Sequence, residues 1–393
     1  MSFKTTQRCC YVGYIVQATV INFLPLLFVI FKNEYNLTYA LLGTLVSVNF
    51  ITQLFVDIVS VFFLERIGYR KSAVAANLFS AAGLAMLAFL PEIMPPFLGV
   101  CIGTVLYSVG GGLIEVVINP IISGLPEECG GNFVLTHSFY SWGQLSVVLF
   151  TTIALRIFGE NSWNIISLCW ALIPLINGIV FIKTPIAPPV AEKERGKISI
   201  FGNKTFLAML ILMICAGGSE IAMAQWASTF AQDALGVDKT LGDLLGPCMF
   251  AFFMGIGRLI YGLYQTRINY RRYMTANCIL CTICYLAAAL SQNPFVSLAG
   301  CAVCGFAIST MWPGVIEFAS KKFPSGGGAM YSAIAIFGDI GCSVAPFLTG
   351  LVASMSLWGE NALRAGLGIN IIYPLGFIVT LMSIRTARAT TTN

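Results

Sequence analysis

The sequence predicts an all-α membrane protein with about twelve transmembrane helices arranged as two six-helix repeats. Three observations lead there: few charges, apolar runs of membrane-spanning length, and a duplicated loop motif. Of the 393 residues, 57% are hydrophobic and 10% are charged, whereas a soluble domain devotes about a quarter of its residues to charge. So few charges cannot form the surface of a water-soluble protein.

The apolar residues fall in runs of about 20, which cross roughly 30 Å of hydrocarbon at about 1.5 Å per residue. The first run begins at Cys9 without a small-residue cleavage site behind it, so we expect a retained helix and not a signal peptide. The predicted spans are 9–31, 39–63, 71–90, 95–120, 133–157, 164–182, 205–231, 243–264, 272–291, 295–317, 329–353 and 361–384.

The basic residues predict the orientation in the membrane. Placing both termini in the cytoplasm puts 17 of the 22 Lys and Arg residues inside and 4 outside, with Arg258 within a span. Cytoplasmic loops carry an excess of positive charge, so we expect a multi-pass protein of the cell membrane with both ends inside. The net charge of +5 then reflects topology, and nothing indicates a nucleic-acid partner.

A hydrophilic stretch divides the chain into two sets of spans. We expect an N-terminal half at 1–182, a cytoplasmic linker at 183–204 and a C-terminal half at 205–393. The loop ERIGYRK at 65–71 recurs as TRINYRR at 266–272, an offset of 267 − 66 = 201 residues. The same offset pairs Asp57 with Arg258, and both residues lie within predicted spans. We interpret these charges as gating elements: Asp57, Glu65, Arg66, Arg258 and Arg267.

The loop at 61–71 resembles the signature between helices two and three of the major facilitator superfamily, with Val61 for the usual Gly and Glu65 for the usual Asp. The run Glu115-x-x-x-Asn119-Pro120, followed by residues 135–143, is similar to the fucose:proton symporter group. This resemblance implies the major facilitator fold and a secondary active transporter of a small polar solute, above all a sugar, by alternating access with proton symport.

Ionisable side chains within the spans point to a site, because each costs roughly 2.5–3.5 kcal/mol to insert. By resemblance, Glu115 binds sugar hydroxyls and exchanges the proton. The family's acid on helix one is absent from Ile21–Pro25, and Glu220 could replace it. The predicted substrate-binding residues are Glu115, Asn119, His137, Tyr140, Gln144, Glu220, Gln225, Trp226, Trp312 and Asp339, with Glu115 and Glu220 as proton-coupling residues.

Glu220, Gln225 and Trp226 form the part of this set that chemistry alone favours. They place an acid, an amide and an aromatic ring on about two turns of helix. Sugar hydroxyls need polar partners, and the C–H face of a sugar ring packs on an aromatic side chain. For each predicted site residue the alternative is a structural role in helix packing.

Other function classes stay open on the sequence alone. Cys281-x-x-Cys284 and Cys301-x-x-Cys304 have metal-site spacing, but Cys also serves as a small apolar residue on helix faces. We therefore expect no enzyme activity, metal or cofactor, with a membrane redox protein as the alternative class. A carrier of organic acids, nucleosides or drugs, sodium coupling in place of protons, and a receptor-like sensor are further alternatives. Five intramembrane acids against one base favour a neutral or cationic solute.

Overall fold

The computed structural model describes residues 2–126, 133–186, 202–264, 269–323 and 327–384. Within these ranges the secondary structure is helical, and twelve segments are long and apolar enough to cross a membrane. The predicted fold class and number of spans are confirmed. Large apolar side chains stand exposed on the outside of the bundle, among them Phe55, Phe295 and Leu357, as expected of a surface that faces lipid.

The first six spans contain seven labelled helices, because Pro25 interrupts the first span. Proline lacks the backbone N–H that an α-helix needs, and residues Leu24–Leu27 form a 3-10 turn. The helices are α1 (Phe3–Asn22), α2 (Phe28–Tyr35), α3 (Tyr39–Ile67), α4 (Tyr69–Ile93), α5 (Pro96–Ser123), α6 (Phe133–Phe158) and α7 (Trp163–Lys183).

The last six spans are interrupted more often. A π-helical turn at Leu244–Cys248 contains Pro247 and divides the eighth span. The helices are α8 (Lys204–Thr229), α9 (Lys239–Asp243), α10 (Met249–Tyr264), α11 (Tyr270–Leu290), α12 (Pro294–Ile308), α13 (Met311–Lys322), α14 (Gly327–Ala353), α15 (Ala362–Gly368) and α16 (Ile372–Ser383).

Short connections turn the chain back into the membrane. One residue, Gly68, separates α3 from α4, with a φ of 87° that favours glycine. In the repeat-equivalent loop, the Asn269 side chain accepts a hydrogen bond from the Arg272 amide and caps α11. The duplicated loop motif therefore flanks the start of a helix in both copies.

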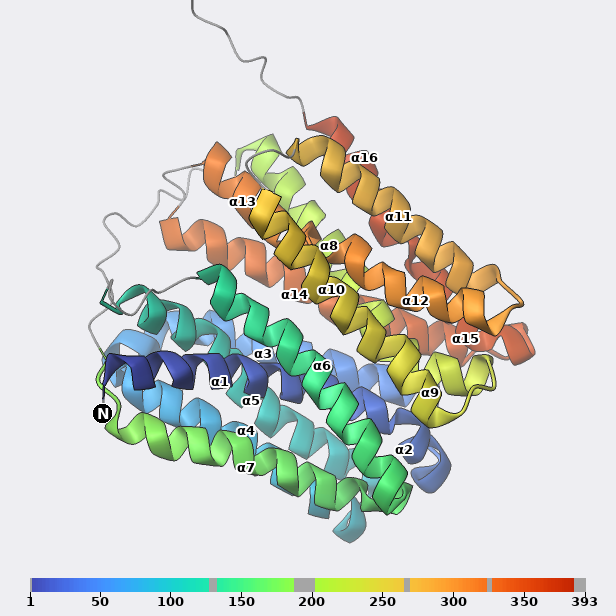
Figure 1. Cartoon of the computed structure of the whole chain (residues 1–393), viewed down its shortest axis with the longest axis horizontal. Coiled ribbons are helices and arrows are strands. Elements are labelled where there is room, and N and C mark those ends of the chain that lie inside the picture. Colours follow the sequence, from blue (N-terminus) through green and yellow to red (C-terminus); the bar gives the residue numbers. More distant parts are fainter. Residues whose placement is uncertain (1, 127–132, 187–201, 265–268, 324–326, 385–393) are drawn as a thin grey trace, which may run out of the picture.

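The two sets of spans form the lower and upper parts of Figure 1. We call α1–α7 and α8–α16 the two halves. The linker side is the side on which α7 ends and α8 begins, and the other side is the far side. Between the halves, α3 packs against α14 and α6 against α10.

Backbones of the two halves approach each other closely where α3 meets α14. A Cβ atom added to Gly350 would lie 2.3 Å from the Tyr39 carbonyl oxygen. Nearby, the Ser47 hydroxyl donates to the Ser343 carbonyl at 2.7 Å. Small residues permit this approach, as is usual between membrane helices.

Candidate functional site

Glu115 of α5 lies in a polar group that joins α5 to α1. The Gln17 amide donates to Glu115 Oε2 at 2.8 Å. One turn away, the Tyr14 hydroxyl donates to Asn119 Oδ1 at 2.8 Å. Glu115 and Asn119 are both half-buried, so their helical spacing does place them on a common, partly accessible face.

Tyr140 of α6 connects this region with the other half. Its hydroxyl accepts a hydrogen bond from the Asn22 amide at 3.5 Å. Its ring carries the hydroxyl into electrostatic contact with Glu220 and Arg258. Tyr140 therefore lies between polar groups of both halves, and its role in binding the substrate stays a prediction.

Arg258 finds its acidic partner on α8. Its Nη2 lies 3.6 Å from Glu220 Oε1, and its Nη1 donates to the Ser141 hydroxyl of the N-terminal half at 2.9 Å. Nε donates to the Ser309 carbonyl at 3.3 Å. Asp57, the repeat-equivalent residue, does not form this pair. The gating interpretation of Asp57 and Arg258 stays a prediction.

Two acids of the region each have one buried carboxylate oxygen without a hydrogen-bond partner. Oδ1 of Asp57 and Oδ2 of Asp339 are buried and unpaired. Both carboxyl groups interact electrostatically with Glu115, and Asp57 also interacts with Asp339. Three acids from α3, α5 and α14 thus share one region. We call Gln17, Asp57, Glu115, Asn119, Tyr140, Glu220, Arg258 and Asp339 the central polar region.

The remaining predicted aromatic and amide residues differ in accessibility. Trp312 is half-buried beside Gly338, where an added Cβ would lie 2.2 Å from its ring. Gln144 is buried. Gln225 is buried and donates to the Ile21 carbonyl at 3.3 Å. Trp226 is fully buried: its indole donates to the Pro346 carbonyl at 3.0 Å and packs against Phe28 and Tyr39.

Trp226 is therefore a packing residue in this conformation and has no face free for a sugar. Gln225 likewise uses one amide hydrogen to join the halves. The triad of acid, amide and aromatic ring does not point to one place, because Glu220 faces Arg258 instead. Among the predicted residues whose side chains the structure describes, the half-buried ones are Glu115, Asn119, Tyr140 and Trp312.

Some predicted residues lie outside what the structure describes. The structure does not describe the side chains of His137 in α6 and Glu65 in α3, and Arg267 lies outside the described residues. Arg66 is exposed at the linker-side end of α3. The gating assignment of Glu65, Arg66 and Arg267 stays a prediction.

Ion pairs that the sequence analysis missed hold the far side together. Lys32 of α2 lies 2.7 Å from Asp233, which also accepts from the Tyr39 hydroxyl at 2.7 Å. Asp233 belongs to the π-helical end of the seventh span. Because 233 − 32 = 201, these residues are separated by the loop-repeat offset. The offset alone could not have found the pair, because repeat-equivalent residues need not meet in space.

A second far-side network is more deeply buried. Lys239 lies 3.1 Å from Asp243, and the two side chains are 9% and 1% exposed. Lys239 also donates to the Leu26 carbonyl at 2.8 Å, and Asp243 accepts from Thr152 at 3.1 Å. Both partners belong to the opposite half, so this network closes the far side. We call Lys32–Asp233–Tyr39 and Lys239–Asp243 together the far-side latch.

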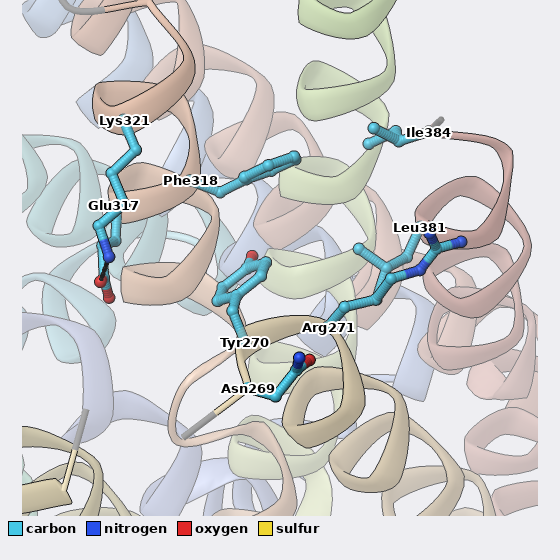
Figure 2. A pocket seen from close by; sticks show the side chains of 8 residues that line it. All are labelled: Asn269, Tyr270, Arg271, Glu317, Phe318, Lys321, Leu381 and Ile384. Carbon is cyan, nitrogen blue, oxygen red and sulfur yellow. Dashed lines mark hydrogen bonds and ion pairs between the residues drawn. The ribbon is translucent and has the colours of Figure 1, made fainter. Parts of the chain in front are cut away.

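Figure 2 shows a pocket of about 260 Å³ on the linker side of the C-terminal half. Glu317 in its wall pairs with Lys321 at 2.5 Å and accepts a hydrogen bond from Tyr261. Arg271 reaches the Met382 carbonyl at 3.1 Å. Charged groups of this pocket are thus already paired within the half, which suits a structural role at the end of the bundle.

The spaced cysteines pack between α11 and α12. Cys281 Sγ and Cys304 Sγ are 3.8 Å apart, and Cys281, Cys284, Cys301 and Cys304 are all buried. Among the described residues, no group of three or more His, Cys, Asp or Glu side chains is placed to hold a metal ion.

A family model describes most of this chain. Residues 10–346 match the model of the Major Facilitator Superfamily. The chain belongs to the major facilitator superfamily. Among curated proteins, none matches the sequence significantly.

Solved structures of other transporters share the fold. A D-xylose-proton symporter has a TM-score of 0.79 and 13% identity, with 96% of both chains covered. A variant of the nucleoside transporter NupG has a TM-score of 0.76 and 12% sequence identity, and the match covers 96% of this chain and 99% of that chain. The E. coli fucose:proton symporter has a TM-score of 0.67 and 15% sequence identity, and the match covers 98% of this chain and 100% of that chain. As a superfamily member with this fold, the protein is a transporter.

Proposed function

We propose that this transporter carries a neutral sugar across the cell membrane, with a proton as the coupling ion. The Gln17–Glu115 pair carries the proposal, because an amide and a carboxylate from two helices meet there on a half-buried surface. Such a pair can both donate to and accept from a sugar hydroxyl. The structural similarity to symporters of D-xylose and fucose supports the same solute class.

Charge favours a neutral solute over an organic acid. A carrier of anions needs a cationic side chain that is free to meet the solute. In the described central polar region, the one basic side chain is Arg258, which Glu220 and Ser141 engage. Glu115, Asp57 and Asp339 would repel an anion.

A nucleoside is the second candidate solute, because it joins a sugar to an aromatic base. Trp312 of α13 is half-buried and lies against Gly338 of α14. An aromatic face suits a base as well as a sugar ring. The similarity in fold to NupG is consistent with this candidate.

Uptake into proteoliposomes tests the proposal. Labelled sugars and nucleosides are offered with an imposed pH gradient, with a sodium gradient, and with neither. We expect accumulation of a sugar that follows the pH gradient and collapses with a protonophore. Accumulation that follows sodium would refute proton coupling, and accumulation of nucleosides alone would refute the sugar.

The proposed orientation places the linker side in the cytoplasm, because the basic loops lie there. The far-side latch is closed in this structure, so the conformation would face the cytoplasm. A cysteine introduced as Ala191→Cys should react with an impermeant thiol reagent only in inverted vesicles. Its labelling from outside intact cells would refute the orientation.

A further inference from the structure

Asp57, Glu115 and Asp339 bring carboxyl groups from both halves into one electrostatic cluster. Asp57 lies on α3 and Glu115 on α5, whereas Asp339 lies on α14 of the other half. Each pair among the three interacts electrostatically. We call these three residues the carboxyl cluster. Its position matters because α3 and α14 pack against each other across the interface that must move during transport.

The cluster lacks the partners that usually stabilise buried charge. Asp339 is 6% exposed and its Oδ2 has no hydrogen bond, and the buried Oδ1 of Asp57 is also unpaired. None of the ion pairs in the described part of the chain includes a cluster member. Glu115 is the exception in hydrogen bonding, with one bond from Gln17. Three unpaired charges of one sign are costly in a low-dielectric interior.

Neighbouring titratable groups do not supply the missing positive charge. Tyr14 of α1 interacts with Glu115, and Cys342 of α14 interacts with Asp339 and Glu115. Neither side chain is cationic. Arg258 lies within a span, but it is paired with Glu220 of α8. The surrounding helices also carry the bases Lys4, Arg8, Arg66, Arg70, Lys71, Arg156, Lys204, Lys321, Lys322 and Arg364 and the acids Glu65, Glu92 and Glu317. His137 of α6 is titratable as well, and its side chain lies outside what the structure describes.

We propose that the carboxyl cluster is one shared proton-binding site spanning both halves, and that its bound proton stabilises the far-side-closed conformation. The proton comes from water and adds to a carboxylate oxygen, which removes one of the like charges. The proton is favoured over a metal cation because it needs a single oxygen and no coordination shell. The shared proton site rests on the proposed proton coupling and names the residues that would carry it. The coupling site would include Asp339 and Asp57 as well as the sugar-binding Glu115.

The proposal has a consequence that needs no solute. Raising the pH removes the shared proton, the carboxylates then repel one another, and the far-side-closed conformation loses stability. The far side should therefore open at high pH. Asn33 and Asn361 are exposed on the far side of the two halves, and both are neutral, so labels there report the opening without changing a charge.

Distances between spectroscopic labels at Asn33 and Asn361 of the full-length protein in nanodiscs test the site between about pH 5 and about pH 9. We expect the mean distance to increase with pH in the wild type. Asp339→Asn and Asp57→Asn should each lose most of this shift. The matched control Glu317→Gln removes an acid outside the cluster, which is paired with Lys321, and should keep the full shift.

Three outcomes would overturn the proposal. If the wild-type distance ignores pH, or if Asp339→Asn and Asp57→Asn both keep the full shift, the cluster does not bind the proton. If replacing potassium by sodium at fixed pH gives the shift instead, the cation is sodium. Should one variant fail to fold, the other variant and the wild-type titration still decide. A pH shift in a protein that moves no sugar would refute the proposed solute and leave the proton site standing.

Discussion

Glu115 is the side chain on which the proposed transport chemistry depends most. It accepts a hydrogen bond from Gln17 and shares the carboxyl cluster with Asp57 and Asp339. Its helical spacing from Asn119 could be predicted from the sequence, because residues four apart share a helix face. The contact of Gln17 with Glu115 could not be predicted from the sequence, because it depends on how α1 packs on α5.

Replacing Glu115 with Gln tests its role directly. Gln keeps the shape and much of the hydrogen bonding but cannot exchange a proton. We expect Glu115→Gln to abolish accumulation against a gradient and to retain part of the solute exchange, because exchange moves no net proton. Uptake and counterflow in proteoliposomes measure the two. Intact proton-driven accumulation would instead assign coupling to Glu220 or Asp339.

The pairing of Arg258 with Glu220 shows a limit of sequence reasoning. The repeat offset relates Arg258 to Asp57 by position, but repeat-equivalent residues need not meet in space. The contact arises because α12 packs against both α10 and α8 and so brings these two helices near each other. Arg258 and Glu220 have side-chain exposures of 21% and 11%, so the pair is mostly shielded from water.

Removing one member of this pair should cost more stability than removing both. Breaking a buried pair costs about 3–5 kcal/mol, and partial exposure lowers this to about 1–3 kcal/mol. We expect Glu220→Gln to lower the Tm in detergent, and Glu220→Gln with Arg258→Gln to recover part of the loss. A thermal-unfolding cycle of the four proteins measures the coupling. Strictly additive losses would show that the pair does not stabilise the fold.

The twelve spans could be predicted because they depend on local features of the sequence, whereas the contacts between helices could not. Apolar length and loop charges are local, so the spans follow from the sequence. The breaks at Pro25 and Pro247 also follow from local chemistry. By contrast, the close contact of Gly350 with Tyr39 depends on two helices separated by more than half the chain, and no local pattern indicates it.

The α3–α14 contact predicts a steric effect on far-side closure. A side chain at Gly350 would clash with the Tyr39 carbonyl, since the Cβ alone would lie at 2.3 Å. We expect Gly350→Val to destabilise the far-side-closed conformation by about 1–3 kcal/mol and to lengthen the Asn33–Asn361 label distance.

Gly255→Ala is the matched control for this substitution. It also lies within a span, but an added Cβ would have its nearest neighbours at 3.9 Å and beyond. It should leave the label distance unchanged. An unchanged distance in Gly350→Val would mean that the helices adjust at this contact without moving apart.

At the scale of the whole molecule, the two halves meet through polar contacts concentrated on the far side. Lys32, Tyr39, Leu26 and Thr152 contribute from one half, and Asp233, Lys239 and Asp243 from the other. Alternating access requires these contacts to break, because a permanently closed far side could not exchange solute. The latch is therefore expected to be reversible.

Cross-linking the latch should stop transport without destroying the site. Lys32→Cys with Asp233→Cys places thiols at the two ends of the Lys32–Asp233 ion pair. Because Cys is shorter than Lys, a bifunctional thiol reagent is used to bridge them. We expect the cross-linked protein to lose uptake and exchange and yet to bind solute from the linker side. When the reagent is cleavable, reducing the cross-link should restore transport.

The control is each single-cysteine variant treated with the same reagent, since the native exposed thiol at Cys169 reacts in all of these proteins. Sustained transport in the fully cross-linked protein would show that the far side need not open, and alternating access by this route would be wrong.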